Sequence, residues 1–218
     1  MKKHNMVFSI KNISFYLLGM IIISFGVVMM LRSLLGVSSW DTLHYSLHKL
    51  TGITVGDATI YVALTFTVFV TVGNKDLKYI GMAIPIFVVG NLIDLFNLNL
   101  LLNYLPKNIF LRILTYIIGL FTLPLGGSLL IISSYPAGVF DEFMLTLMRV
   151  FKTEKLILIR IIMELSAVTL AIVLGFMAGI QFGMFNIGTL IFSVSVGMLI
   201  KFYLKLFASM GLYELKQN

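Results

Sequence analysis

The sequence predicts an all-α, polytopic membrane protein with six transmembrane helices, arranged as two inverted three-helix repeats. Three observations indicate this fold class. First, 59% of the 218 residues are hydrophobic, 11% are charged, and the mean hydropathy is +1.03. Second, several uncharged runs are long enough to cross a bilayer, which takes about 20 apolar residues in a helix. Third, the two halves of the chain resemble each other at an offset of 100 residues.

The composition excludes several other classes of protein. Soluble domains are about 45–50% apolar and about 25% charged, so this chain lacks the charge to cover a soluble surface. The net charge of +7 comes from basic residues placed between apolar runs, which indicates membrane orientation rather than a nucleic-acid partner. Cysteine is absent and only three histidines occur. We therefore expect no metal site and no cofactor, and without a catalytic motif we expect no enzymatic activity.

Six apolar runs are predicted to span the membrane. The first, at 13–34, is too long for the apolar core of a signal peptide, so we expect it to be retained. The uncharged stretch at 165–200 is too long for one span, and we divide it at the glycines between 175 and 183. The predicted spans are 13–34, 57–73, 77–96, 109–133, a fifth beginning at 154 and a sixth ending at 207. We expect 97–107 to be an interfacial connection.

Two further segments, 39–50 and 139–150, are too short to cross. Each has an apolar stripe at helical spacing: Trp40, Leu43, Leu47 and Leu50 in the first, and Phe140, Phe143, Leu147 and Val150 in the second. Polar and charged residues lie off each stripe. The pattern predicts a short amphipathic helix after the first span of each repeat, either interfacial or re-entrant.

The internal repeat divides a single membrane domain, 1–218, into halves at about 13–107 and 113–207. The pairs that match at an offset of 100 include Gly19/Gly119, Gly26/Gly126, Asp41/Asp141 and Leu47/Leu147. Since each half crosses the membrane three times, the halves must have opposite orientations. Inverted repeats of this kind are typical of transporters, whose sites lie near the midplane where the repeats meet.

Lys and Arg residues predict the orientation, because they are enriched on the cytoplasmic side of membrane proteins. With both termini inside, the inner side holds Lys2, Lys3, Lys11, Lys75, Lys78, Arg149, Lys152, Lys155, Arg160, Lys201, Lys205 and Lys216, and the outer side holds Arg32, Lys49, Lys107 and Arg112. We therefore expect both termini to be cytoplasmic.

Several segments resemble a known family. The run GVSSWDTLH at 36–44, followed by LTGIT at 50–54, resembles the YczE/YyaS/YitT-like family of bacterial integral membrane proteins, and most closely its YczE-like branch. IGM at 80–82 and NIGT at 186–189 also resemble the family. It usually has Pro where this chain has Ser39, and only Gly138 and Asp141 match its second-half motif. The resemblance implies a multi-pass protein of the bacterial cytoplasmic membrane, without naming a substrate.

The candidate functional residues cluster around the short helices. Ser38 and Asp41 have the spacing of a helix cap, so their role is either to cap the helix or, together with the corresponding Gly138–Asp141 segment, to bind a solute or ion. Glu164 lies near the middle of the fifth span, where an isolated carboxylate is costly. Arg160, four residues earlier, is placed to neutralise it. The alternative is a proton or substrate site.

Other polar residues have simpler interpretations beside the functional one. Asp94 is expected near the outer interface, where it either extends toward the membrane surface or pairs with Arg112, and Arg32 is placed to pair with Asp41 or Asp57. The complete set of candidate substrate-binding residues is Ser38, Ser39, Trp40, Asp41, His44, Asn91, Asp141, Arg160 and Glu164.

The leading functional hypothesis is a small-solute transporter or permease of unknown substrate, with no catalytic residues. The alternative is a non-transporting membrane protein with a regulatory or scaffolding role. Expected partners are membrane lipids and an unknown small solute, with a homo-oligomer as a possible assembly.

Overall fold

The structure, a computed structural model, describes residues 9–133, 135 and 138–212, and these residues form helices without any strand. The helices are α1 (Ile10–Ser33), α2 (Ser39–Thr51), α3 (Val55–Asn74), α4 (Ala83–Asp94), α5 (Ile109–Ile132), α6 (Val139–Val150), α7 (Leu156–Met177) and α8 (Ile187–Ser209). A 3₁₀ segment at Leu77–Met82 precedes α4 and a π-helical segment at Leu95–Leu100 follows it, so that the three form one rod.

Within these residues, six helical segments are long and apolar enough to cross a membrane. They are α1, α3, the rod at Leu77–Leu100, α5, α7 and α8. These six segments confirm the predicted spans, although the rod continues past the predicted end at residue 96 because the π-helical turn extends it. The predicted short helices are also confirmed, as α2 and α6.

Special backbone conformations end the helices where the sequence predicts breaks. The helix α2 stops at Gly52, whose φ of 78° is most easily adopted by glycine and whose N–H donates to the His48 carbonyl. Between α7 and α8, Gly179, Gln181 and Gly183 all have positive φ. This turn divides the long uncharged stretch into two spans, as predicted.

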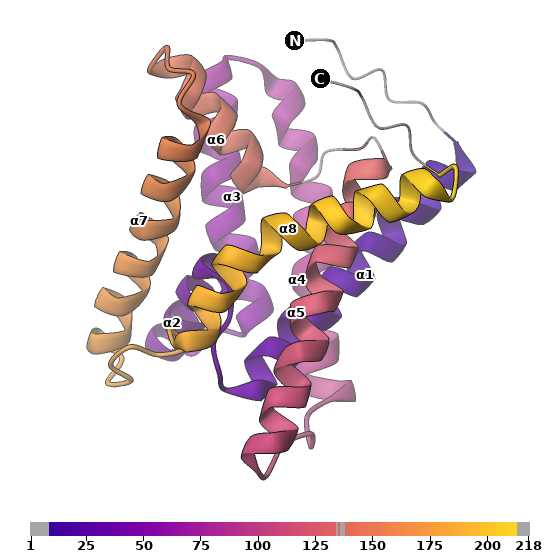
Figure 1. The fold of residues 1–218 in the computed structure, drawn as a ribbon. Coiled ribbons are helices and arrows are strands. Elements are labelled where there is room, and N and C mark those ends of the chain that lie inside the picture. Colours follow the sequence, from indigo (N-terminus) through magenta and orange to yellow (C-terminus); the bar gives the residue numbers. More distant parts are fainter. Residues whose placement is uncertain (1–8, 134, 136–137, 213–218) are drawn as a thin grey trace.

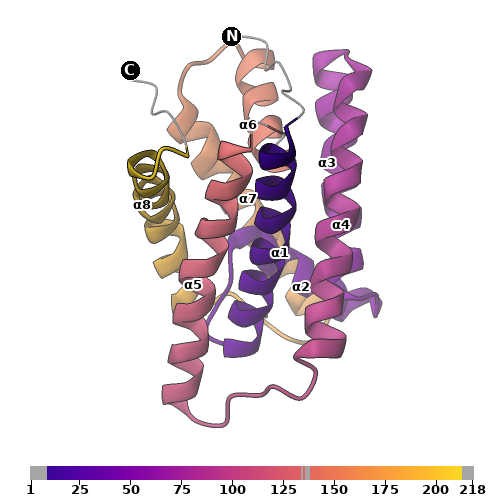
Figure 2. The ribbon, with the colours of Figure 1, turned by 90° about the vertical axis from the view of Figure 1, so that its right-hand side faces the viewer.

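The helices α1 and α5 run antiparallel through the centre of the fold, side by side (Figure 2). Glycines allow their backbones to touch. A Cβ added to Gly126 would lie 2.8 Å from the Gly19 carbonyl oxygen, and one added to Gly119 would lie 2.9 Å from the Gly26 carbonyl oxygen. Small residues permit this approach between membrane helices, which is stabilised by packing rather than by water exclusion.

The remaining helices surround this central pair. The helix α4 packs against α1, and α8 packs against α5, while α2 packs against α7 and α6 against α3. The start of α1 and the end of α8 lie at the same end of the molecule, together with α6, whereas α2 lies toward the opposite end (Figure 1). The two short helices therefore enter the fold from opposite ends.

Candidate functional site

The first turns of α2 and α6 meet inside the fold. Trp40 and Phe140, each the second residue of its short helix, stack with ring centroids 4.0 Å apart and an interplanar angle of 14°. Phe66 packs edge-on against both rings, at 5.2 and 5.4 Å. Since Phe66 lies in the central part of α3, this contact is at mid-depth. We call these three aromatic residues and the first turns of α2 and α6 the helix junction.

On the α2 side, a complete cap closes the helix. The Ser38 hydroxyl accepts a hydrogen bond from the Asp41 backbone N–H at 3.1 Å and donates one to the Asp41 carboxylate at 2.5 Å. The Thr42 hydroxyl donates to the Ser38 carbonyl. The capping role predicted for Ser38 and Asp41 is therefore present, and Ser39 beside them is buried.

His44 extends this polar group into the protein interior. Its Nδ1 lies 3.5 Å from Asp41 Oδ1 and 3.2 Å from the Thr59 hydroxyl of α3. Its ring lies 6.2 Å from that of Phe140, next to the junction. The residue is only 2% exposed, and its Nε2 has no hydrogen-bond partner. Buried polar atoms normally have partners, so an unpaired Nε2 calls for a functional explanation.

The α6 side of the junction differs chemically from the α2 side. Gly138 stands where α2 has Ser38, and no side chain caps the helix. Asp141 is more exposed than Asp41. Its carboxyl group nevertheless lies among protein atoms that displace water and raise its pKa, and the positive charge of Arg160 partly offsets this rise. Both short helices have an aspartate as their third residue, but a capping side chain binds Asp41 and not Asp141.

Arg160 and Glu164 lie in the first half of α7, the helix that also packs against α6. Arg160 is exposed and Glu164 is half-buried. The salt bridges among the described residues do not join these two side chains, so the expected neutralising pair is not formed. The charge of Arg160 acts on Asp141 instead.

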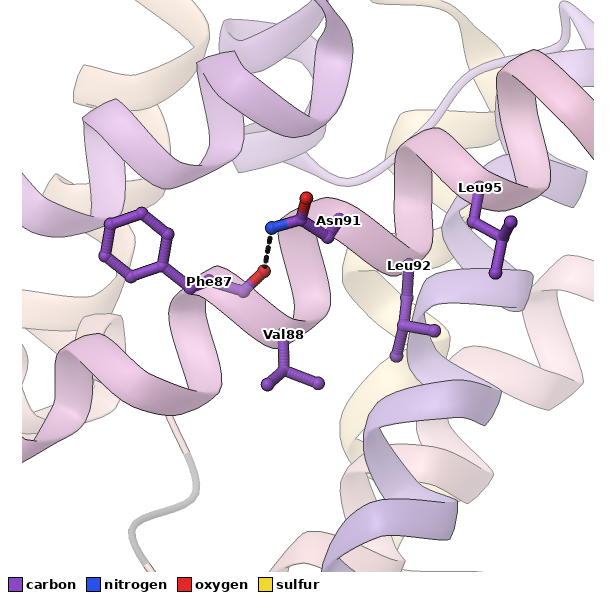
Figure 3. A pocket seen from close by; sticks show the side chains of 5 residues that line it. All are labelled: Phe87, Val88, Asn91, Leu92 and Leu95. Atoms are coloured by element: carbon purple, nitrogen blue, oxygen red, sulfur yellow. Dashed lines mark hydrogen bonds between the residues drawn. The ribbon is translucent and has the colours of Figure 1, made fainter.

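Asn91 does not belong to this group. It lies on the outer surface of α4, where its side-chain amide donates to the Phe87 carbonyl at 2.7 Å. Phe87, Val88, Asn91, Leu92 and Leu95 line a shallow hollow that faces away from the molecule (Figure 3). An apolar hollow on a membrane-facing helix suits a lipid chain better than a polar solute.

Two expected ion pairs are wrong in detail. Asp94 accepts hydrogen bonds from the Gly56 backbone N–H at 2.9 Å and from the Thr54 hydroxyl, so it caps the start of α3 rather than pairing with Arg112. Arg32 donates to the carbonyls of Asn97 and Leu102, at the end of the π-helical rod, rather than to an aspartate.

Several residues of the site have no clear signal in the sequence. Thr59 and Phe66 are ordinary residues of an apolar span, and only their spatial neighbours make them part of the junction. A second polar cluster was also missed. Arg149 of α6 donates to Asn74 and Tyr79 and forms a salt bridge with Glu142 at 3.1 Å, which ties the far end of α6 to α3.

Comparison with known proteins gives two matches. A family of unknown function (DUF6198) matches residues 10–205. The Uncharacterized membrane protein YczE of Bacillus subtilis (strain 168) is 35% identical over 85 residues, which cover 38% of this chain and 40% of that protein. The matched part thus spans two fifths of this relative. No solved structure matches this chain.

Proposed function

The chain belongs to the family of unknown function (DUF6198), and we propose that this multi-pass membrane protein transports a small solute across the bacterial cytoplasmic membrane. The Bacillus subtilis relative indicates that the chain is YczE-like. The observation that supports the proposal most strongly is the helix junction, where two short helices from opposite ends meet at mid-depth through Trp40 and Phe140. Transporters commonly bind their substrates where the N-termini of broken helices meet near the midplane.

An inverted repeat is part of this proposal. Trp40 and Phe140 are equivalent at the offset of 100 residues, and so are the central glycine pairs of α1 and α5. Contact between equivalent residues is expected on a pseudo-two-fold axis that relates two inverted halves. The packing of α2 on α7 and of α6 on α3 supports the same relationship.

The proposed orientation has the α6 end in the cytoplasm. The described basic residues at that end are Lys11, Lys75, Lys78, Arg149, Lys152, Lys155, Arg160, Lys201 and Lys205, and those at the α2 end are Arg32, Lys49, Lys107 and Arg112. Lys2, Lys3 and Lys216 lie outside the described residues. The excess at the α6 end supports cytoplasmic termini.

The candidate residues would bind different chemical groups of the solute. Helix N-termini favour negative charge, so the first turns of α2 and α6 suit the anionic group of a solute. Asp41, Asp141 and Glu164 supply acidic groups for a positive one. A zwitterion or a small anion with a hydrogen-bond donor fits this mixture best.

Uptake by proteoliposomes tests the proposal. We expect a substrate to be found among radiolabelled small anions and zwitterions, such as phosphate, acetate, glycine and betaine. Uptake should fall to the level of empty liposomes in the Glu164→Gln variant and be retained in Asp57→Asn, which removes an acid at the start of α3. Equal uptake by wild type and Glu164→Gln for every solute would contradict transport.

One observation favours the regulatory alternative. The stacked rings of Trp40 and Phe140 close the junction, and the polar side chains below them are buried. A protein that never opens there would serve as a partner of another membrane complex. Trp40→Ala distinguishes the two functions, because removing the ring from a permeation path should increase solute leak, whereas a scaffold should remain tight.

A further inference from the structure

We propose that His44 is a proton-binding site at the helix junction, with its Nε2 as the proton acceptor. This inference deepens the proposed transport function, since a proton bound there would couple to solute movement. The buried and unpaired Nε2 itself does not depend on that function.

The hydrogen bonds of Nδ1 fix the tautomer. The single hydroxyl proton of Thr59 is donated to the Val55 carbonyl at 2.9 Å, so the Thr59 oxygen acts as an acceptor toward Nδ1. The negatively charged Asp41 carboxylate lies 3.5 Å from the same nitrogen. An acceptor oxygen and a carboxylate beside one nitrogen favour Nδ1 as the nitrogen that carries the hydrogen. In a neutral imidazole the other nitrogen is then an acceptor, and Nε2 therefore presents an unused lone pair.

A proton is the ligand that fits the enclosed space at His44 Nε2. Nε2 is enclosed, so it can take up a proton from hydronium without the space that a solute requires. The reaction forms one N–H bond and breaks one O–H bond of hydronium, leaving water. It also changes the buried pair of His44 and Asp41 from a net charge of −1 to zero.

The charged groups around His44 do not oppose this assignment. On α2 the neighbouring titratable groups are Asp41 and His48, whose Nδ1 bonds to the Ile53 carbonyl. On α3 the charged group is Asp57, and on α6 Asp141 and Glu142 follow Phe140. On α7, Arg160 and Glu164 lie in the first half, where the charge of Arg160 acts on Asp141, and the part from Leu165 to Met177 contains no charged residue. Asp41 is the charged group in contact with the His44 ring.

His44 lies next to the Trp40–Phe140 stack, with its ring centroid 6.2 Å from that of Phe140. Opening of the stack would therefore change the surroundings of His44, which is the behaviour required of a coupling site.

Nitrogen NMR of ¹⁵N-histidine-labelled protein in nanodiscs tests the proposal. The chain has three histidines, and the variants His4→Gln and His48→Gln identify the His44 signals by elimination. At neutral pH we expect protonated Nδ1 and unprotonated Nε2, the reverse of the usual tautomer in water. Acidification should protonate Nε2 reversibly. A protonated Nε2 at neutral pH, or no titration while the protein stays folded, would overturn the proposal.

Two matched variants separate the acceptors of Nδ1. Asp41→Asn removes the carboxylate charge beside Nδ1, so the share of the tautomer with hydrogen on Nδ1 should fall. Thr59→Val keeps the side-chain shape and leaves Asp41 in place, so the tautomer should persist. An unchanged tautomer in Asp41→Asn would contradict the role of the pair.

A flux measurement separates this inference from the proposed function. In proteoliposomes loaded with a pH-sensitive dye, His44→Gln should abolish proton entry that accompanies solute uptake. If the NMR result holds but His44→Gln leaves this proton entry unchanged, the proton site stands and its coupling to transport is wrong. If the wild type takes up no solute, the transport function is wrong and the proton site stands. If the NMR result fails, the proton site is wrong whatever the flux.

Discussion

Trp40 and Phe140 occupy equivalent positions in two helices 100 residues apart, and their rings stack face to face at 4.0 Å. Trp40 is the only tryptophan of the chain. Its fluorescence therefore reports on the helix junction alone, without labels or background from other sites. Any change that opens the junction should alter the environment of this indole.

Removal of the Phe140 ring should open the junction. We expect Phe140→Ala to cost about 1 to 3 kcal/mol, the range for a lost aromatic pair and a partly filled cavity. The Trp40 emission should shift to longer wavelength and become more accessible to a water-soluble quencher. Phe176→Ala is the control, because Phe176 packs on Phe182 and on no ring of the junction. A shift of equal size in the control would contradict the specific contact.

Features local in sequence could be predicted well. The segments 39–50 and 139–150 correspond to α2 at Ser39–Thr51 and α6 at Val139–Val150, because an apolar stripe with helical period is a property of adjacent residues. The spans follow from hydropathy for the same reason. The Ser38 cap was predictable too, since its partner Asp41 is three residues away.

Contacts between distant segments could not be predicted. Asp94 caps α3 because the rod at Leu77–Leu100 brings it to Gly56, which lies 38 positions earlier in the chain. An acidic residue near a helix end has many possible partners, and the sequence gives no distances between them. The pairing of His44 with Thr59 was missed for the same reason, although His44 itself was a candidate.

The central helix pair provides a sharp test of packing. Gly126→Ala places a Cβ 2.7 Å from the Ile23 backbone nitrogen and 2.8 Å from the Gly19 carbonyl oxygen, and backbone atoms cannot move aside cheaply. We expect a loss of about 1 to 3 kcal/mol from overpacking. The measurement is the thermal unfolding midpoint in detergent or nanodiscs.

The adjacent Gly127 is the matched control for this substitution. A Cβ at Gly127 meets nothing within 4 Å, so Gly127→Ala should be neutral or stabilise the helix by up to about 1 kcal/mol. Equal destabilisation by both variants would show that helix propensity or insertion, rather than the approach of α1 to α5, determines the result.

Asp94→Ala should weaken the start of α3. The substitution leaves the Gly56 N–H and the Thr54 hydroxyl without their acceptor, which costs about 1 to 3 kcal/mol for buried donors. Hydrogen exchange should increase in the first turn of α3 before it increases elsewhere. Asp57→Ala removes an acid from the same turn and should cost less than about 1 kcal/mol. Equal exchange in both variants would contradict the capping role.

Asp141 should make stability depend on pH in the acidic range. Protein atoms around it raise the pKa of its carboxyl, so the folded protein binds a proton at a higher pH than the unfolded chain does. Where the folded state holds more protons, stability falls as pH rises. The unfolding midpoint of the wild type should therefore decrease as the pH rises from the ordinary aspartate pKa through the raised one. Asp141→Asn should remove this part of the slope and match or exceed the wild type at neutral pH. The steeper dependence of Asp141→Asn, or its lower midpoint at neutral pH, would mean that the attraction of Arg160 exceeds the cost of lost hydration.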